Sequence, residues 1–362
     1  MSRIQALCTI LRNAEADAML LIGEVNLVYA TSVTNLEGSI LLFPDDTAFF
    51  ITDGRYIEVA EQQLVPQGFT VLLRTVERNI TTIIKSLLEK RGAKIMLYED
   101  DVLTVRQYRE MQKNYEGTEL KPIGEQISLL RACKSADEIA CIEKAQRIAE
   151  DAFKEFLEWL QVGVSEKQAA AMLDYLMAKR GSEKPSFETI LLFGENTSKP
   201  HGVPSERRLR AGDFVTADFG AVWHGYHSDM TRTFACGEVT DEMRRVYSTV
   251  LQAQIAAEAM AREEIPCSEM HKAAANIISA AGYGQYFTHA LGHSVGLEIH
   301  ESPSASPSCN LPLQNGVVMT NEPGIYLAGK FGVRIEDMLV IQGNTPRNLT
   351  KAPKELMVMV VK

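Results

Sequence analysis

Two strand-like segments, residues 214–221 and 226–235, each carry one aspartate among apolar neighbours, and this feature limits the possible folds most strongly. A short turn at Trp223-His224 separates the segments and predicts a hairpin in which Asp218 faces Asp229 if the pairing is regular. Cross-strand partners hold their Cβ atoms about 5 Å apart, and two carboxylates at that distance repel each other unless a cation lies between them. Solvated acids on a sheet would explain either aspartate alone. Burial of both, which the apolar neighbours favour, predicts a metal site.

A second informative segment, residues 289–301, contains three of the seven histidines of the chain. These are His289, His293 and His300, and the glycines at positions 292 and 296 allow a ligand or another backbone to approach closely. A single histidine in an apolar segment is usually a packing residue. Three histidines among glycines instead favour metal binding or proton transfer.

Two further acids lie in apolar segments late in the chain. Glu322 ends an apolar run directly before Pro323-Gly324, and Glu336 lies inside a strand-like segment, residues 333–341. A period of two places Glu336 on the same face as Arg334, and a glutamate inside such a strand is rarely buried without a partner. The partner is either Arg334 or a metal ion, and the two explanations are compatible.

The local patterns predict an α/β region followed by an α+β region. Residues 1–125 alternate strand-like and helix-like stretches: strands at 18–22, 39–43, 48–51 and 94–98, and a helix at 78–91 that stops at Gly92. Pro44-Asp45-Asp46 predicts a turn that joins the second and third strands in a hairpin.

After a boundary near residues 121–124, helices alternate with strands. Ser135 and Glu138 match a capping box, in which each side chain satisfies an amide at the start of a helix, and Ser165 with Gln168 starts another helix that ends at Gly181. The apolar stripe after Ser135 is typical of core packing. Further helices are expected at 242–262 and 268–281, and strands at 214–221, 226–235, 317–321 and 333–341. We therefore expect helices covering a largely antiparallel sheet.

The charge and composition exclude several classes of protein. A formal net charge of −10 without a Lys/Arg cluster argues against a nucleic-acid partner, which requires a basic surface. No apolar run approaches the ~18 residues of a membrane span, and the first residues lack the apolar core of a signal peptide, so we expect a cytoplasmic protein with no membrane partner. The six cysteines include no C-x-x-C pair and are expected to be free thiols.

Together, the acidic and histidine-containing segments closely resemble the pita-bread metallopeptidases, in particular the Xaa-Pro aminopeptidase and Xaa-Pro dipeptidase (prolidase) branch. The segments that match, in order, are Asp218-Phe219-Gly220, Ser228 to Thr233, Gly292-His293 to His300-Glu301, Asn321-Glu322-Pro323-Gly324 and Val333 to Asp337. Upstream, Ser186 to Ile190 and Lys199-Pro200-His201-Gly202 also match. The resemblance implies a pita-bread catalytic domain at residues 128–362. It also implies a smaller creatinase/prolidase-like α/β domain at 1–125, which carries Thr52-Asp53-Gly54-Arg55-Tyr56.

The resemblance also implies the roles of nine side chains. Two divalent metal ions, Mn²⁺ first and otherwise Co²⁺, Zn²⁺ or Fe²⁺, would bind to Asp218, Asp229, His293, Glu322 and Glu336, with Asp229 and Glu336 bridging. A hydroxide shared by the ions would attack the scissile carbonyl, with Glu322 as the proton acceptor and His201 and His300 stabilising the oxyanion. His289 and Arg334 would contact substrate, and Arg334 would also orient Glu336.

The resemblance leaves the choice of substrate open. Ala290 and Ser294 stand where the family commonly has glycine, and Asn321 stands where it often has a residue such as isoleucine. Some prolidases carry an arginine shortly after the His-Glu pair, suited to a dipeptide carboxylate, whereas here Ser302-Pro303-Ser304 follows Glu301. We therefore expect a dinuclear-metal Xaa-Pro aminopeptidase acting on proline-containing peptides, with Xaa-Pro dipeptidase as the alternative. More distant alternatives are a creatinase-like enzyme and a non-catalytic binding protein. Because relatives are often dimers, we also expect a homodimer.

Overall fold

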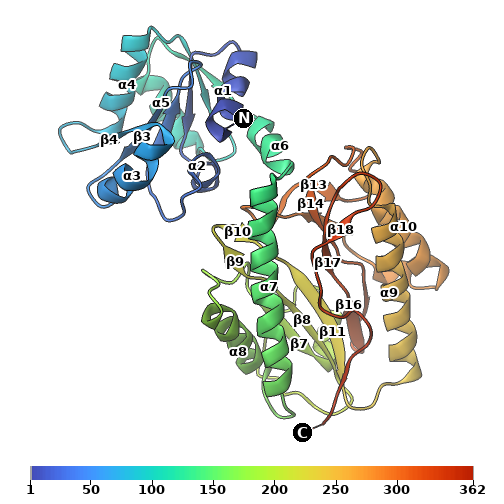
Figure 1. Cartoon of the computed structure of the whole chain (residues 1–362). Coiled ribbons are helices and arrows are strands. Elements are labelled where there is room, and N and C mark those ends of the chain that lie inside the picture. The colour runs from blue at the N-terminus through green and yellow to red at the C-terminus, as the bar shows by residue number, and fades with distance from the viewer. Residues whose placement is uncertain (1, 362) are drawn as a thin grey trace. The chain divides into compact units, whose positions relative to one another are not determined.

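A computed structural model describes residues 2–361, which form two compact units divided between Arg131 and Ala132 (Figure 1). Helix α6 (Gln126–Ala132) spans this division. Within residues 2–361, none of the helices combines the length and the apolar character needed to cross a lipid bilayer.

The first unit is built on one six-stranded sheet, as the alternation of strands and helices predicts. The strand order is β4-β3-β2-β1-β5-β6; β2 is antiparallel to both β1 and β3, and the other neighbours are parallel. The strands are β1 (Ala18–Leu21), β2 (Ser39–Leu42), β3 (Ala48–Thr52), β4 (Phe69–Leu73), β5 (Ile95–Tyr98) and β6 (Glu119–Pro122). The helices are α1 (Arg3–Asn13), α2 (Glu24–Thr31), α3 (Ile57–Leu64), α4 (Ile80–Arg91) and α5 (Val105–Asn114), with a 3₁₀ turn at Val65–Gln67.

Local signals explain the elements of the first unit. The predicted hairpin is present, with Ser39 paired to Ile51, and α4 ends where Gly92 adopts a left-handed φ of 62°. Ile83, Ile84 and Leu88 of α4 pack into one apolar cluster with the strands of the sheet. The predicted α/β fold of this region is therefore confirmed.

The second unit has helices on the outside and sheets within, as expected for an α+β domain (Figure 1). The long helices are α7 (Ala136–Trp159), α8 (Glu166–Lys179), α9 (Asp241–Met260) and α10 (Cys267–Ala280), and 3₁₀ turns occupy Gly194–Ser198 and Gly284–Tyr286. The predicted capping boxes at Ser135 and Ser165 are both present. Helices α7 and α8 share one apolar core with the first sheet of this unit, and α9 and α10 share another with the second sheet.

The two sheets of the second unit are largely antiparallel. The first has the order β19-β11-β8-β7, in which only β19 runs parallel to its neighbour, and the second has the order β13-β12-β14-β17-β18. Their strands are β7 (Ile190–Phe193), β8 (Phe214–Phe219), β11 (Met230–Cys236), β19 (Val358–Met359), β12 (Gly292–Ser294), β13 (Glu301–Ala305), β14 (Val318–Asn321), β17 (Asp337–Val340) and β18 (Arg347–Asn348). Two small hairpins complete the unit: β9 (Val222–Trp223) with β10 (Tyr226–His227), and β15 (Gly324–Leu327) with β16 (Phe331–Arg334).

The register of the hairpin that carries Asp218 and Asp229 differs from the prediction by two residues. Asp218 is paired with Thr231 and not with Asp229, because the turn is centred on His224-Gly225 and not on Trp223-His224. Both turn residues have positive φ, 51° and 77°, a combination that suits the right-handed twist of a tight hairpin. A shift of two residues preserves the face of the strand, so both acids can still lie on one side.

Two predicted strands are interrupted at acids. The segment 226–235 divides into β10 and β11 at Ser228-Asp229, and 333–341 divides into β16 and β17 at Ile335-Glu336. The second break occurs because β16 pairs with β15 whereas β17 pairs with β14 in the second sheet. At this break, the amide of Glu336 donates to the carbonyl of Thr231 at 3.1 Å, which joins the two broken segments.

A buried ion pair fixes the loop that carries His300. Lys134 Nζ lies 2.9 Å from Glu301 Oε2, with side-chain exposures of 1% and 5%. The other carboxylate oxygen of Glu301 accepts from the amides of Leu297 and Glu298. A buried charge without a partner destabilises the folded state, so the burial of Lys134 depends on Glu301 and that of Glu301 on Lys134.

We expect Lys134→Met to destabilise the second unit by about 3–5 kcal/mol, because it leaves the buried Glu301 carboxylate without its cation. The chain has two tryptophans, Trp159 and Trp223, and both lie in the second unit, so fluorescence during urea unfolding reports on that unit. The surface pair of Lys167 with Glu206 supplies the control, and Lys167→Met should cost less than about 1 kcal/mol. Equal losses in the free energy of unfolding for the two variants would show that the buried pair stabilises the second unit no more than the surface pair does.

Candidate metal centre and active-site pocket

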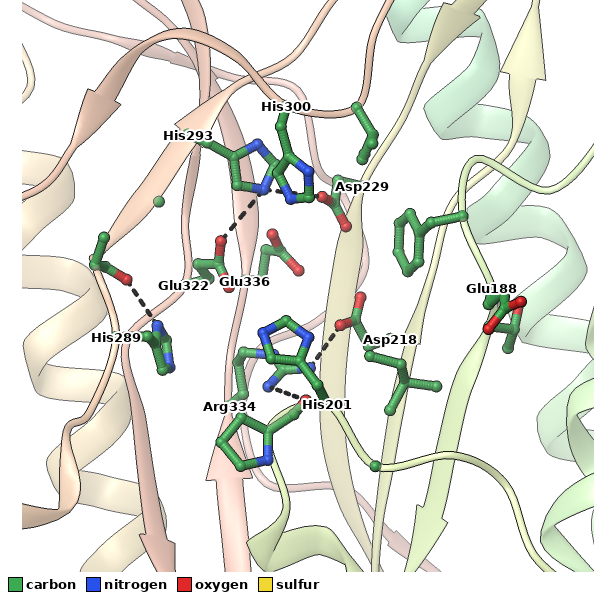
Figure 2. A pocket seen from close by; sticks show the side chains of 18 of the residues that line it. Glu188, His201, Asp218, Asp229, His289, His293, His300, Glu322, Arg334 and Glu336 are labelled. Atoms are coloured by element: carbon green, nitrogen blue, oxygen red, sulfur yellow. Dashed lines mark hydrogen bonds and ion pairs between the residues drawn. The ribbon is translucent and has the colours of Figure 1, made fainter.

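One cavity in the second unit, of about 460 Å³, is lined by all nine side chains that the sequence singles out. They come from β8, from the breaks before β11 and β17, and from β12, β16 and the adjoining loops (Figure 2). The nine residues are His201, Asp218, Asp229, His289, His293, His300, Glu322, Arg334 and Glu336.

Three of the side chains are close enough to share a metal ion. Asp229, His293 and Glu336 each offer a ligand atom, and these atoms lie within 4.8 Å of one another. Nε2 of His293 also lies 3.5 Å from Oε1 of Glu322, the same distance as from Oδ2 of Asp229. Four of the five predicted ligands are thereby linked by measured distances.

The orientation of His293 suits a metal ligand. Its Nδ1 lies 3.2 Å from the carbonyl oxygen of Ser294, so a proton on Nδ1 leaves the Nε2 lone pair directed at the acids. Burial, with a contribution from His300, lowers the pKa of His293 to about 4, which keeps the imidazole neutral near pH 7. Thr320 connects this side to Glu322: its hydroxyl accepts from the amide of His293 and donates to Oε1 of Glu322, each at 3.0 Å.

The acids of the cluster are buried against one another. Burial first, and then the charge of Glu336, raises the pKa of Asp229 well above its ordinary value. Burial and Glu322 raise the pKa of Glu336 in the same way. Burial also raises the pKa of Glu322 to about 7. A divalent cation among these oxygens would remove the repulsion and hold the acids ionised.

Asp218 is held by Arg334, and this corrects the predicted partner of that arginine. Arg334 Nη2 lies 2.5 Å from Oδ2 of Asp218, and its link to Glu336 is indirect. Nε of Arg334 donates to the hydroxyl of Thr231 at 3.0 Å, and that hydroxyl donates to Oε2 of Glu336 at 2.7 Å. The contact between Arg334 and Asp218 joins two distant segments of the chain, so the periodicity of residues 333–341 alone could not predict it.

The structure orients His289 through a tyrosine that sequence reasoning did not identify. Arg334 Nη1 donates to the hydroxyl oxygen of Tyr326 at 2.8 Å, and that hydroxyl lies 2.9 Å from Nε2 of His289. Nδ1 of His289 lies 2.7 Å from the carbonyl of Ala290. A proton on Nδ1 lets Nε2 accept from the tyrosine, so the contacts form one directed chain from Arg334 to Ala290. Burial lowers the pKa of His289 to about 4, consistent with a neutral ring.

His201 and His300 are exposed and approach the acids from different sides. Figure 2 shows His300 beside His293, and His201 on the other side of the acids from these two histidines. The rings of His300 and His293 are 4.3 Å apart at an angle of 72°. The carbonyl of Pro200, next to His201, accepts from Arg334 Nη1 at 3.3 Å. Both imidazoles are therefore free to meet a substrate in the cavity.

Three hydroxyl residues complete the site, and the sequence analysis did not assign them. Thr231, Thr320 and Tyr326 each connect two of the predicted site residues by hydrogen bonds. Thr231 lies inside the Ser228–Thr233 segment that carries the resemblance, and this was the one available signal. Thr320 and Tyr326 lie in strands, where threonine and tyrosine are common, so nothing in the sequence marks them as site residues. Their roles follow only from the tertiary structure.

The donor set fits divalent metal ions. One imidazole and four carboxylates converge, and Oδ1 of Asp218 is buried without a hydrogen-bond partner among residues 2–361. Oxygen-rich sites with one imidazole suit Mn²⁺, Co²⁺, Fe²⁺ or Zn²⁺. A bound ion would supply the missing partner of Asp218 and the missing positive charge.

Comparisons with known proteins agree with this geometry. A family model described as metallopeptidase family M24 matches residues 140–343, and one described as the creatinase/prolidase N-terminal domain matches residues 3–133. An Xaa-Pro dipeptidase of Pyrococcus horikoshii is 36% identical over 94% of this chain and 94% of its own. The structure of an Xaa-Pro dipeptidase from Bacillus anthracis is 35% identical with a TM-score of 0.93, covering 98% of this chain and 99% of the other. That of an X-Pro aminopeptidase from Thermotoga maritima is 33% identical with a TM-score of 0.91, covering 97% and 99%.

We expect Mn²⁺ to raise the unfolding temperature of protein first treated with EDTA, because the ion relieves the repulsion among the buried acids. At a hundredfold excess over its dissociation constant, a ligand stabilises the folded state by about 2.7 kcal/mol. The Asp229→Asn variant should lose most of this shift, whereas Glu238→Gln, an exposed acid outside the cavity, should keep it. The same shift in all three proteins would show that the ion binds elsewhere.

Proposed function

Because the chain belongs to metallopeptidase family M24, we propose that it is a Xaa-Pro dipeptidase, which hydrolyses the bond between an N-terminal residue and a following C-terminal proline. The observation that carries the proposal is the convergence of one imidazole and four carboxylates in a single cavity. Two relatives that match nearly the whole chain bear the name Xaa-Pro dipeptidase. These relatives favour the dipeptidase over the aminopeptidase that the sequence alone suggested.

Xaa-Pro aminopeptidase is the second candidate, and two observations favour it. The Thermotoga maritima protein, named X-Pro aminopeptidase, is nearly as similar as the dipeptidases. Ser304 lines the cavity, and no arginine follows Glu301 in the position that suits a dipeptide carboxylate. Metal-free creatinase-like hydrolysis and a non-catalytic role are not favoured, because all five expected ligand residues are present in the cavity.

We assign the metal ligands as follows. Asp218 would hold one divalent ion, His293 and Glu322 the other, and Asp229 and Glu336 both, with Mn²⁺ as the first choice of metal and Co²⁺, Zn²⁺ or Fe²⁺ as alternatives. When bound, such ions acidify water and polarise a carbonyl group. The proposal that there are two ions rests on the number of carboxylates, since three ligands suffice to explain the close cluster.

The protein side chains then bind the substrate and move protons. Glu322, hydrogen-bonded to Thr320, would accept a proton from the attacking water and deliver it to the leaving proline nitrogen. His201 and His300, which are exposed on two sides of the acids, would donate to the carbonyl oxygen as negative charge develops on it. A prolyl bond has no N–H and a rigid ring, so its recognition depends on the shape of the cavity more than on backbone hydrogen bonds.

Arg334 and His289 would act together on the substrate side. Arg334 fixes Asp218 directly and His289 through Tyr326, so a change at one of these residues should disturb the others. We further propose that residues 1–125 form a creatinase/prolidase-like domain and residues 128–362 the catalytic domain. We also propose that the protein is a homodimer and lies in the cytoplasm.

A panel of Xaa-Pro dipeptides and Xaa-Pro-Yaa tripeptides tests the choice between the two peptidases. With Mn²⁺, Co²⁺ or Zn²⁺ supplied in turn, we expect kcat/KM for the dipeptides to exceed that for the matched tripeptides about tenfold, equivalent to ~1.4 kcal/mol. Mass spectrometry of the products measures both activities, and Xaa-Ala dipeptides serve as the control for proline specificity. Faster release of the N-terminal residue from tripeptides would instead establish the aminopeptidase.

The Tyr326→Phe variant tests the chain of contacts behind the site. Loss of the hydroxyl removes the acceptor for Arg334 and the donor for His289, so we expect kcat/KM to fall about 10- to 100-fold. Stabilisation by Mn²⁺ should remain, because Tyr326 offers no ligand atom to the cluster. Unchanged turnover, or loss of the Mn²⁺ effect, would refute a positioning role for this tyrosine.

A further inference from the structure

The cavity contains one acid that the metal centre does not use. Glu188 lines it together with Asp218, Asp229, Glu322 and Glu336, but it belongs neither to the ligand set nor to the hydrogen-bond networks described above. The side chain is exposed, and it has no hydrogen-bond or ion-pair partner among residues 2–361. Figure 2 shows it apart from the cluster, on the far side of Asp218 from His293. An unpaired carboxylate facing a substrate cavity is available for a cation of the substrate.

The backbone on either side of Glu188 is anchored. The amide of Ser186 donates to the carbonyl of Gly220 at 2.9 Å, and the hydroxyl of Ser186 lies 2.9 Å from Nδ1 of His227. On the other side, the hydroxyl of Thr189 donates to Oδ1 of Asp174 at 2.5 Å. The backbone at Glu188 is therefore fixed before the substrate arrives, so an ion pair with Glu188 has to order only its side chain.

The location of Glu188 fits the side chain of the N-terminal residue better than its α-ammonium group. Ile190, in β7, is paired directly with Asp218, and Glu188 precedes Ile190 by two residues, up to about 7 Å of extended chain. The α-ammonium is only two bonds from the scissile carbonyl carbon and must lie beside the metal ligands. A group as far away as Glu188 is within reach of a long side chain.

The cavity wall around Glu188 matches such a side chain. Phe187 directly precedes the acid and Ile190 follows it by two residues, and Val203 and Pro204 line the same cavity. Apolar walls suit the methylene groups of lysine or arginine, and the carboxylate suits the terminal cation. Among the described residues that line the cavity, the acids other than Glu188 all belong to the proposed metal centre.

We propose that Glu188 is a specificity-determining residue that favours substrates with lysine or arginine before proline. This inference rests on the proposed cleavage at Xaa-Pro bonds, but it does not depend on whether the substrate is a dipeptide or a longer peptide.

The test compares Lys-Pro with norleucyl-proline, which lacks only the terminal ammonium group. For the unmodified protein loaded with Mn²⁺, we expect kcat/KM for Lys-Pro to exceed that for norleucyl-proline about tenfold. In Glu188→Gln the ratio should fall to about 1 through loss of the Lys-Pro activity alone, and in the control Glu238→Gln it should stay unchanged. Glu188→Lys should reverse the preference and favour Glu-Pro over Lys-Pro.

Two results would overturn the proposal. An equal loss of kcat/KM on both substrates in Glu188→Gln would mean that the carboxylate meets the α-ammonium or supports the fold. Unchanged kcat/KM on both substrates would mean that it meets neither cation of the substrate. If the protein cleaves no dipeptide, the same ratios are measured on Lys-Pro-Ala and norleucyl-Pro-Ala. Failure of the dipeptidase assignment is thereby separated from failure of the subsite.

Discussion

Four carboxylates and one imidazole are brought together in this fold with the guanidinium of Arg334 among them, and the rest of the structure depends on that concentration of negative charge. Burial is the largest cause of the raised pKa values of Asp229, Glu322 and Glu336. The negative charges of neighbouring acids raise these pKa values further. Arg334 neutralises one carboxylate, that of Asp218. The arrangement is reasonable for a protein that binds divalent cations there, because buried like charges are otherwise destabilising.

The backbone around the cluster is adapted to hold these groups. Asp229 and Glu336 lie at interruptions between strands, where the backbone turns from one pairing to another and can aim a side chain between the sheets. Behind them, Arg232 is almost fully buried; its guanidinium donates to the backbone carbonyl of Glu336 and forms a 2.7 Å ion pair with Asp337. Gln254 also donates to Asp337 at 2.8 Å. This second polar network fixes the main chain at the proposed metal ligand Glu336.

The local sequence predicts much of the fold but not the contacts that complete the site. Capping boxes at Ser135 and Ser165 and the glycine after α4 identify helix ends, because those signals depend on neighbouring residues only. The hairpin register was wrong by two residues because the left-handed conformations of His224 and Gly225 move the turn. The pairing of Arg334 with Asp218, and the hydroxyl of Tyr326 between Arg334 and His289, join segments that no periodicity connects. The preference for a dipeptide or a longer peptide likewise depends on the shape of the cavity, which local sequence patterns do not predict. The names of similar proteins supplied the basis for that choice.

Anomalous X-ray diffraction from crystals loaded with Mn²⁺ locates metal ions without reference to activity, so it is the sharpest test of the proposed metal centre. We expect two anomalous peaks in the cavity, one next to Asp218 and one next to His293 and Glu322, with Asp229 and Glu336 in contact with both. A single peak held by Asp229, His293 and Glu336 would refute the two-ion centre. No peak among these five side chains, or peaks elsewhere on the protein, would contradict the claim that this cluster of acids is a metal centre.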